Sequence, residues 1–223
     1  MEATEALKDF ALKQSADMVG VADLRTLKTL YAYPRGLLGK YKYAVSIAVC
    51  LKAYEPYNSR TEDQSFDRLL EVAESLKGYL EAKGNAAKVI PPDRRVGLKG
   101  ALYWRGELSH KAIARAAGLG WIGRSLLLIT PDFGPRVNLV TVLTDADLQP
   151  DKPLSDRCGS CTACVRACPV GALKPRRFEG YPGRTKDLLD VNKCGAWVEK
   201  SYRKGELCFK CMLACPFGSG RHG

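Results

Sequence analysis

The chain has 223 residues, of which 46% are hydrophobic, and a formal net charge of +11. This length allows one sizeable domain with its own core and one small domain. The segment Met1–Phe10 contains early acidic residues and no apolar stretch, and no apolar run approaches the length of a membrane-spanning helix. We therefore expect no signal peptide and no membrane span, and the positive charge suits an anionic partner.

The first ninety residues predict alternating helices and strands. Apolar residues at helical spacing predict three helices, and the third begins at a capping-box sequence, Thr61-Glu-Asp-Gln64. These helices are expected over residues 2–16, 24–31 and 61–83. Short apolar runs predict strands over residues 18–22, 43–50 and 86–90. The run 43–50 is apolar throughout, which is typical of a central strand, and its Cys50 is predicted to be a core residue.

The next segment is expected to begin with a loop. Residues 93–106 are basic and include Tyr103 and Trp104, so this loop is either the rim of a cofactor or substrate site or a plain solvated connection. A helix is expected over residues 107–117, with His110 in a structural or surface role. The strands that follow are expected over residues 125–129 and 137–144, as an antiparallel pair around a turn at 131–134.

Glycines are frequent in residues 118–123, directly after this predicted helix. A dinucleotide-binding loop would instead follow a strand and open a helix. We interpret these glycines as allowing a close approach of the backbone to a flat cofactor, or as a tight turn. Residues 145–157 contain two prolines and are expected to link two domains, 1–150 and 151–223.

Eight of the nine cysteines lie in the last third of the chain. They form the runs Cys158-Gly-Ser-Cys161-Thr-Ala-Cys164-Val-Arg-Ala-Cys168-Pro169 and Cys208-Phe-Lys-Cys211-Met-Leu-Ala-Cys215-Pro216, with Cys194 between them. Three cysteines separated by two residues each can bind three irons of one 4Fe–4S cubane, and the following Cys-Pro ligates another cluster. Zinc sites also use Cys-x-x-Cys pairs, but not a triplet followed by Cys-Pro, and a disulfide framework would need an oxidising compartment.

The spacing therefore predicts two 4Fe–4S clusters with four cysteine ligands each. The first cysteine set is Cys158, Cys161, Cys164 and Cys215. The second cysteine set is Cys168, Cys194, Cys208 and Cys211. Cys194 joins the second set because the second run lacks one early cysteine. The last cysteine of each run thus crosses to the other cluster, which ties the two clusters into one folded unit.

Several segments together resemble the epoxyqueuosine reductase family. They are Met18-Val-Gly-Val-Ala-Asp23, Ala117-Gly-Leu-Gly-Trp-Ile-Gly123, Leu126-Leu-Leu-Ile-Thr-Pro131, Leu143-Thr144 and the order of the eight cysteines. The resemblance runs from about Leu12 to Pro216 and extends to the related reductive dehalogenases. It implies an α+β fold, in which a nitroreductase-like α/β domain is followed by a small ferredoxin-like domain with two 4Fe–4S clusters. It also implies that low-potential electrons pass through the clusters to a cobalamin.

The resemblance further implies residues that contact this cofactor. By position they are Ser125, Leu126, Phe209, Lys210 and, more weakly, Gly195 and Ala196. Trp121 would add apolar surface and Arg124 a cation at the same place. A corrinoid is expected there, with FMN as the second choice. The competing interpretation is that these residues, Trp121 above all, only hold the core together.

Two departures from the family concern its reaction on tRNA. Members that reduce the tRNA base carry an Asp-Thr/Ser-Gly/Ala-Pro stretch whose Asp is the proton donor, whereas the aligned residues here are Trp104-Arg-Gly-Glu107. Those members also continue into a helical-repeat module that helps to bind tRNA, whereas this sequence ends at Gly223. Both departures argue against action on tRNA.

The sequence thus predicts an iron–sulfur oxidoreductase. It would take electrons from a ferredoxin- or flavodoxin-type donor and pass them to a corrinoid or flavin, either to reduce a small molecule or to reactivate a corrinoid on another protein. The alternative is an electron carrier or adaptor without its own substrate, whose basic rim meets an acidic partner. RNA binding ranks last because no RNA-binding motif is visible. Reduced thiols and oxygen-sensitive clusters suit the cytoplasm.

Overall fold

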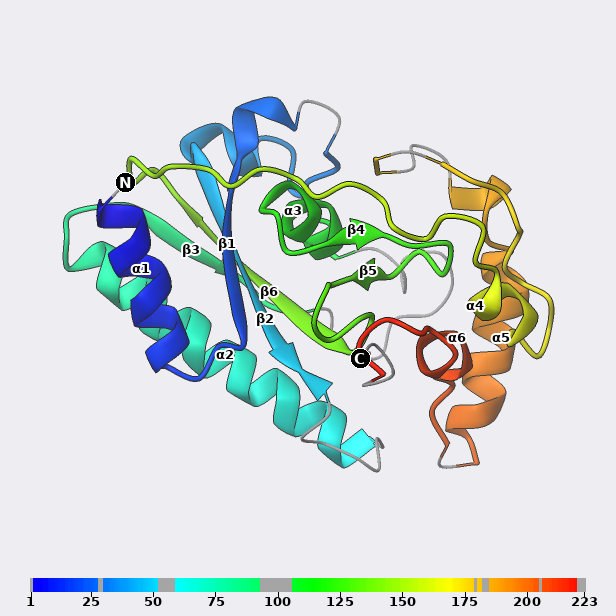
Figure 1. The fold of residues 1–223 in the computed structure, drawn as a ribbon. Helices are drawn as coiled ribbons and strands as arrows, with labels where there is room; N and C mark the ends of the chain where they lie inside the picture. The colour runs from blue at the N-terminus through cyan, green and yellow to red at the C-terminus, as the bar shows by residue number, and fades with distance from the viewer. Residues whose placement is uncertain are drawn as a thin grey trace. The chain divides into compact units, whose positions relative to one another are not determined.

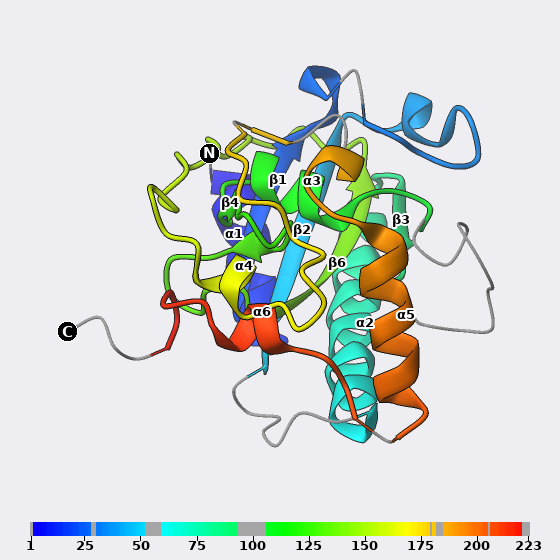
Figure 2. The ribbon, with the colours of Figure 1, turned by 90° about the vertical axis from the view of Figure 1, so that its right-hand side faces the viewer.

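The computed structural model describes residues 2–27, 30–51, 59–92, 106–178, 180–181, 185–204 and 206–219. The chain forms two compact units, whose elements are drawn in Figures 1 and 2. The first unit comprises Met1–Val49, Phe66–Leu119 and Asn138–Pro153. The second comprises Cys50–Ser65, Gly120–Val137 and Leu154–Gly223. The basic loop with Tyr103 and Trp104 lies outside the described residues.

The first unit is built on a four-stranded sheet with the strand order β1-β2-β6-β3 (Figure 1). Its strands are β1 (Met18–Asp23), β2 (Tyr43–Cys50), β3 (Ala87–Ile90) and β6 (Val137–Thr144). β1 and β2 are antiparallel, with Gly20 opposite Ser46, and so are β3 and β6, with Val89 opposite Val142. All eight residues of β2 are buried. This interior position explains why its sequence is apolar without polar alternation.

Three helices cover this sheet. They are α1 (Glu2–Lys13), α2 (Ser59–Glu81) and α3 (His110–Ala116). α1 and α2 lie on one face of the sheet and α3 on the other (Figure 1). α3 begins three residues later than predicted because the Ser109 side chain accepts a hydrogen bond from the Ala112 N–H at 3.4 Å and caps the helix there. No described helix combines the length and the apolar character that crossing a bilayer requires.

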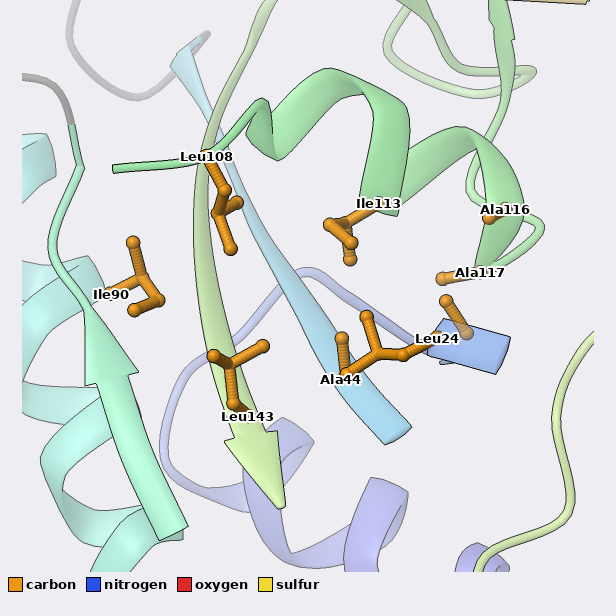
Figure 3. Close-up of a cluster of buried hydrophobic side chains, with 9 residues drawn as sticks. Leu24, Ala44, Ile90, Leu108, Ile113, Ala116, Ala117 and Leu143 are labelled. Carbon is orange, nitrogen blue, oxygen red and sulfur yellow. The ribbon is translucent and has the colours of Figure 1, made fainter. Parts of the chain in front are cut away.

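A cluster of buried side chains fills the space between α3 and the sheet (Figure 3). Ile113 of α3 faces the strands that carry Ala44 and Leu143. The other members are Ala22, Leu24, Ile90, Leu108, Ala116 and Ala117. Full burial of one large aliphatic side chain stabilises a fold by about 1.5–3 kcal/mol, so this cluster is a real core. His110 is also buried, with Nδ1 2.8 Å from Thr141 Oγ1, which gives it a structural role.

The helix predicted over residues 24–31 is a short 3-10 turn, Leu24–Thr26. Asp23 Oδ1 accepts a hydrogen bond from the Arg25 N–H at 2.9 Å and fixes the start of this turn. Leu27 then leaves the helical region, with φ −102° and ψ 47°. Among the described residues, this single turn is the only part of the predicted helix that forms.

The predicted pairing of residues 125–129 with 137–144 is wrong. β5 (Leu128–Ile129) pairs instead with β4 (Trp121–Ile122), while β6 joins the four-stranded sheet. The chain reverses between β4 and β5 at Leu126, whose φ is +59° and whose N–H bonds to the Gly123 carbonyl at 2.8 Å. The turn expected at 131–134 exists, because Thr130 and Gly134 exchange backbone hydrogen bonds of 2.9 and 3.0 Å.

The second unit contains the β4–β5 pair and three helices. They are α4 (Ala163–Arg166), α5 (Val191–Tyr202) and α6 (Lys210–Leu213). α4 and α6 lie side by side in both views and pack against each other (Figures 1 and 2). Each leads into a Cys-Pro sequence followed by a turn with a left-handed glycine, Gly171 at φ +57° and Gly218 at φ +68°. The two cysteine runs thus share one local conformation.

Candidate iron–sulfur site

The first cysteine set lines one small hollow in the second unit. Its members lie before α4, within α4 and directly after α6: Cys158, Cys161, Cys164 and Cys215. Ile129, Phe217 and Arg124 are among the other residues that line it. Four thiols around one space are the donor set of a 4Fe–4S cubane.

The loop that carries Cys158 is held by the β4–β5 hairpin. The buried guanidinium of Arg124 donates hydrogen bonds to the backbone carbonyls of Cys161 and of Gly159, the latter at 2.8 Å. The indole N–H of Trp121 donates to Cys158 Sγ at 3.5 Å. Trp121 is 1% exposed, so its ring is fixed by packing and its N–H favours one position of the Cys158 sulfur.

The chain after Cys215 is held by a second buried arginine. Arg136 donates to the carbonyls of Phe217 at 2.9 Å and Leu213 at 3.3 Å. The ring of Phe217 meets Trp121 edge to face, with centroids 4.9 Å apart. These contacts fix the end of the second run, and they place Cys215 in the hollow formed by the first run.

The neighbours of Cys211 are seen in its electrostatics. Burial, followed by the nearby negative charge of neighbouring thiolates, raises the pKa of Cys211 to about 12. Those neighbours are Cys208, Cys194, Cys164 and Cys168. Cys211 thus feels the charge of all three other members of its set, and also that of Cys164 from the first set.

Cys168 has the opposite balance. Burial acts to raise its pKa, but the backbone N–H groups of residues 170–173 together outweigh burial, so the pKa is lowered. The Ala172 N–H lies 3.3 Å from Cys168 Sγ. These donors favour the thiolate, which is the form that binds iron.

Cys194 is tied to the turn that follows Cys168. The Asp190 N–H donates to the Ala172 carbonyl at 2.9 Å, and the Asp190 side chain accepts from the Lys193 N–H at 3.0 Å, which caps α5. The Cys194 N–H bonds in turn to the Asp190 carbonyl at 3.0 Å. The first turn of α5 thereby carries Cys194 to the neighbourhood of Cys168.

Among the described residues, no three Cys, His, Asp or Glu side chains form a group that could hold a single metal ion. A cubane distributes four ligands over four irons, so its thiols lie farther apart than the ligands of one zinc ion. The two cysteine sets fit the larger group in number and in ligand type.

Comparison with known proteins also indicates two 4Fe–4S clusters. Residues 157–218 match the family described as 4Fe-4S double cluster binding domain. The chain is 40% identical over 121 residues to the epoxyqueuosine reductase of Listeria monocytogenes, which covers 52% of this chain and 31% of that protein. It is 30% identical over 202 residues to the epoxyqueuosine reductase of Synechocystis, which covers 88% of this chain and 63% of that protein.

The chain therefore resembles epoxyqueuosine reductases over most of its length, and its residues 157–218 match a domain that binds two 4Fe–4S clusters. It spans less than two thirds of the length of these relatives, 31% of one and 63% of the other.

Solved structures share the fold of this epoxyqueuosine-reductase-like chain. An epoxyqueuosine reductase with an epoxyqueuosine-modified tRNA-Tyr stem loop has a TM-score of 0.69 at 25% identity, over 98% of this chain and 66% of that one. The Bacillus subtilis enzyme was solved with its Asp-bearing catalytic loop swung out of the active site. It has a TM-score of 0.67 at 24% identity, with the same coverage of both chains. A reductive dehalogenase linked to B12-dependent dehalogenation has a TM-score of 0.73 at 24% identity. The match covers 97% of this chain and 32% of that one. The predicted α+β fold, nitroreductase-like and then ferredoxin-like, is confirmed.

The residues predicted to line a planar cofactor do not gather in one place. Phe209 and Lys210 line a cavity of about 490 Å³ within the second unit, next to Cys208. Arg124 and Ser125 line instead the hollow of the first cysteine set. Of the remaining four, Trp121 lies at Cys158 and Leu126 is buried in the β4–β5 turn, while Gly195 is half-buried and Ala196 exposed in α5.

Sequence reasoning missed two residues of this cavity. Trp197 lines it from α5, and its position three residues after Cys194 on one helix could have indicated a shared face. Arg136 lines it as well, but its partners Phe217 and Leu213 are 81 and 77 residues away, so no local signal could have found it.

Proposed function

We propose that this chain is an iron–sulfur oxidoreductase whose clusters pass single electrons to a group bound in the cavity beside Cys208. In this proposal the first cysteine set holds one cluster and the second set holds the other. One observation carries the proposal: a cavity of about 490 Å³, a size common for ligand sites, is lined by a cysteine of the second set. A bound group would therefore lie next to the second cluster.

The lining of the cavity suits a planar cofactor with polar substituents. Trp197 and Phe209 offer aromatic surface, and Arg136 and Lys210 offer cationic donors. A corrinoid is the first candidate, because a structural neighbour is linked to B12-dependent chemistry, and FMN is the second. A corrinoid would supply the low-potential reducing chemistry. The residues of the chain would bind and orient it, and would tune it by hydrogen bonding.

The proposed substrate is not tRNA. In the Bacillus subtilis relative an aspartate lies on the catalytic loop, whereas the aligned stretch here ends in Glu107 and has no Asp. The Glu107 carboxylate is 3.2 Å from Lys88 Nζ, so it is engaged in an ion pair. Without a positioned acid, the proton transfer of the tRNA reaction would be slow. Restored queuosine in a strain that lacks the reductase would contradict this part of the proposal.

The first experiment counts the clusters. Anaerobic reconstitution should give about eight irons and about eight acid-labile sulfides per chain, as two sites of four cysteines require. Cys194→Ala should remove the second cluster and keep the resonance signal of the first. Stoichiometric zinc, or about half the iron in the unchanged chain, would contradict the two-site assignment.

The second experiment tests the cavity. Aquocobalamin and FMN are titrated into the reconstituted protein, and binding is read from the optical spectrum. Phe209→Ala combined with Lys210→Ala should weaken binding without loss of iron, because both line the cavity. Lys174→Ala is the matched control, since Lys174 is exposed in the same unit and does not line the cavity.

A second candidate function is an electron carrier or adaptor without its own substrate. The absent Asp and the net charge of +11 favour it, because a basic surface steers an acidic redox partner. Absence of binding by both cofactors, under reducing and oxidising conditions, would select this function. In either case we propose a ferredoxin- or flavodoxin-type donor and a cytoplasmic setting, as oxygen-sensitive clusters require.

A further inference from the structure

Arg124 is a buried cation beside the first cysteine set. It is 6% exposed and lines the hollow formed by Cys158, Cys161, Cys164 and Cys215. Two of its guanidinium nitrogens donate to the carbonyls of Gly159 and Cys161. The third, Nε, is buried and has no hydrogen-bond partner among the residues that the structure describes.

A buried N–H group normally has an acceptor, because water has been removed from it and nothing else compensates. The hollow that Arg124 lines is also the place where four thiols meet. A cluster bound there would bring sulfur atoms that carry negative charge. We propose that Arg124 donates its Nε–H to a sulfur of the first cluster and raises the reduction potential of that cluster. This inference rests on the proposed assignment of the first cysteine set to one cluster.

The direction of the effect follows from charge. Reduction adds one electron to the cluster and no proton, so the reduced cluster is more negative by one charge. The guanidinium keeps its positive charge throughout, and the hydrogen that it would donate to the sulfur carries a partial positive charge. Both interactions stabilise the reduced cluster more than the oxidised one, which raises the potential. Because Arg124 is buried, salt and water screen this interaction little.

A matched cation in the same unit allows a control. Arg166 lies in α4 between Cys164 and Cys168, but its side chain is exposed and bonds to Thr162 Oγ1 at 2.6 Å. Its charge is close to the clusters in sequence but is screened by water. If any nearby positive charge were sufficient, replacing Arg166 would have the same effect as replacing Arg124.

The experiment is a redox titration of the reconstituted full chain, monitored by electron paramagnetic resonance. Arg124→Gln should lower the potential of one cluster only, and Cys158→Ser should identify that cluster as the first by altering its signal. Arg124→Lys keeps the charge and should recover part of the shift, while Arg166→Gln should leave both potentials in place. An iron-replete Arg124→Gln protein with unchanged potentials, or with a shift in the second cluster, would overturn the proposal.

A measurement on the unchanged protein covers the case in which Arg124 variants lose iron, since Arg124 also holds the Cys158 loop. Protein grown with nitrogen-15 arginine and reduced by one electron should show a coupling between an arginine nitrogen and the first cluster in pulsed resonance spectra. If protein with two intact clusters shows no such coupling, the proposed role of Arg124 is refuted and the cluster assignment still stands. Iron for one cluster only would instead refute the assignment in the proposed function.

Discussion

The backbone N–H of Asp190 donates to the carbonyl oxygen of Ala172 at 2.9 Å, and this bond joins two ligand-bearing segments. Ala172 in turn places its own N–H 3.3 Å from Cys168 Sγ, while the Asp190 side chain caps the helix that carries Cys194. One short chain of hydrogen bonds therefore connects Cys168 with Cys194. Two cysteines 26 positions apart in the sequence are thus linked through four short contacts, as the proposed second cluster requires.

Asp190→Ala tests this connection. Loss of the capping side chain costs about 0.5–2 kcal/mol of helix stability. We expect the second cluster to release iron to a chelator about fivefold faster, which corresponds to about 1 kcal/mol. The first cluster should be unaffected. Asp190→Asn is the control, because asparagine caps helices nearly as well as aspartate, and equal iron release in both variants would argue against the capping role.

Cys50 provides a control for every cysteine variant. It is buried in β2, outside both cysteine runs. Cys50→Ala should leave iron and sulfide content unchanged. Its expected effect is a loss of unfolding free energy of about 1 kcal/mol, as for a small core substitution, measured by denaturant titration. Lower iron content in this variant would mean that Cys50 contributes to a cluster.

The metal-free protein should lose stability at alkaline pH. Burial raises the pKa of Cys211 to about 12 and that of Cys215 to about 11, from the ordinary value of 9.0. The fold therefore favours the neutral thiols. Their contribution to stability is fully present below pH 9.0 and is lost as the pH rises toward 11 and 12. Thermal unfolding of the iron-free protein should shift to lower temperature across this window.

Iron binding removes this pH dependence, because the ligating cysteines are already deprotonated. Protein with both clusters should show no comparable decrease over the same alkaline window. Cys211→Ala in the iron-free protein should flatten the curve, because the most strongly shifted thiol is gone. If the unfolding temperature of iron-free Cys211→Ala fell with pH as steeply as before, other groups would be responsible for the loss of stability.

The gathering of the first cysteine set around one hollow was accessible from sequence, because iron–sulfur ligation depends on local spacing. Cys158, Cys161 and Cys164 are separated by two residues each, and the Cys-Pro sequence at Cys215 indicated the crossing that the hollow shows. The buried strand β2 was equally clear from its apolar run. The β4–β5 pairing was not accessible, because it depends on a positive φ at Leu126, a residue type that rarely adopts one. The contacts of Arg136 were hidden because their acceptors are distant carbonyls.

Gly134 connects the turn after β5 to the end of the second cysteine run. A Cβ atom on Gly134 would lie 2.0 Å from the Phe217 carbonyl oxygen, and its φ is +58°. Gly134→Ala must therefore push Phe217 away and disturb Cys215, two residues earlier. We expect loss of the first cluster, measured as a decrease in iron and as loss of the resonance signal that Cys158→Ser also alters.

Gly159→Ala separates the clash from backbone strain. Gly159 lies next to Cys158 and has a similar φ of +50°, but a Cβ there meets nothing within 4 Å. This variant carries only the cost of a left-handed alanine, about 1–2 kcal/mol. It should keep both clusters, with a modest decrease in unfolding free energy. If Gly159→Ala lost the first cluster as readily as Gly134→Ala, backbone strain would explain both results, and the contact between Gly134 and Phe217 would have no special role in holding Cys215.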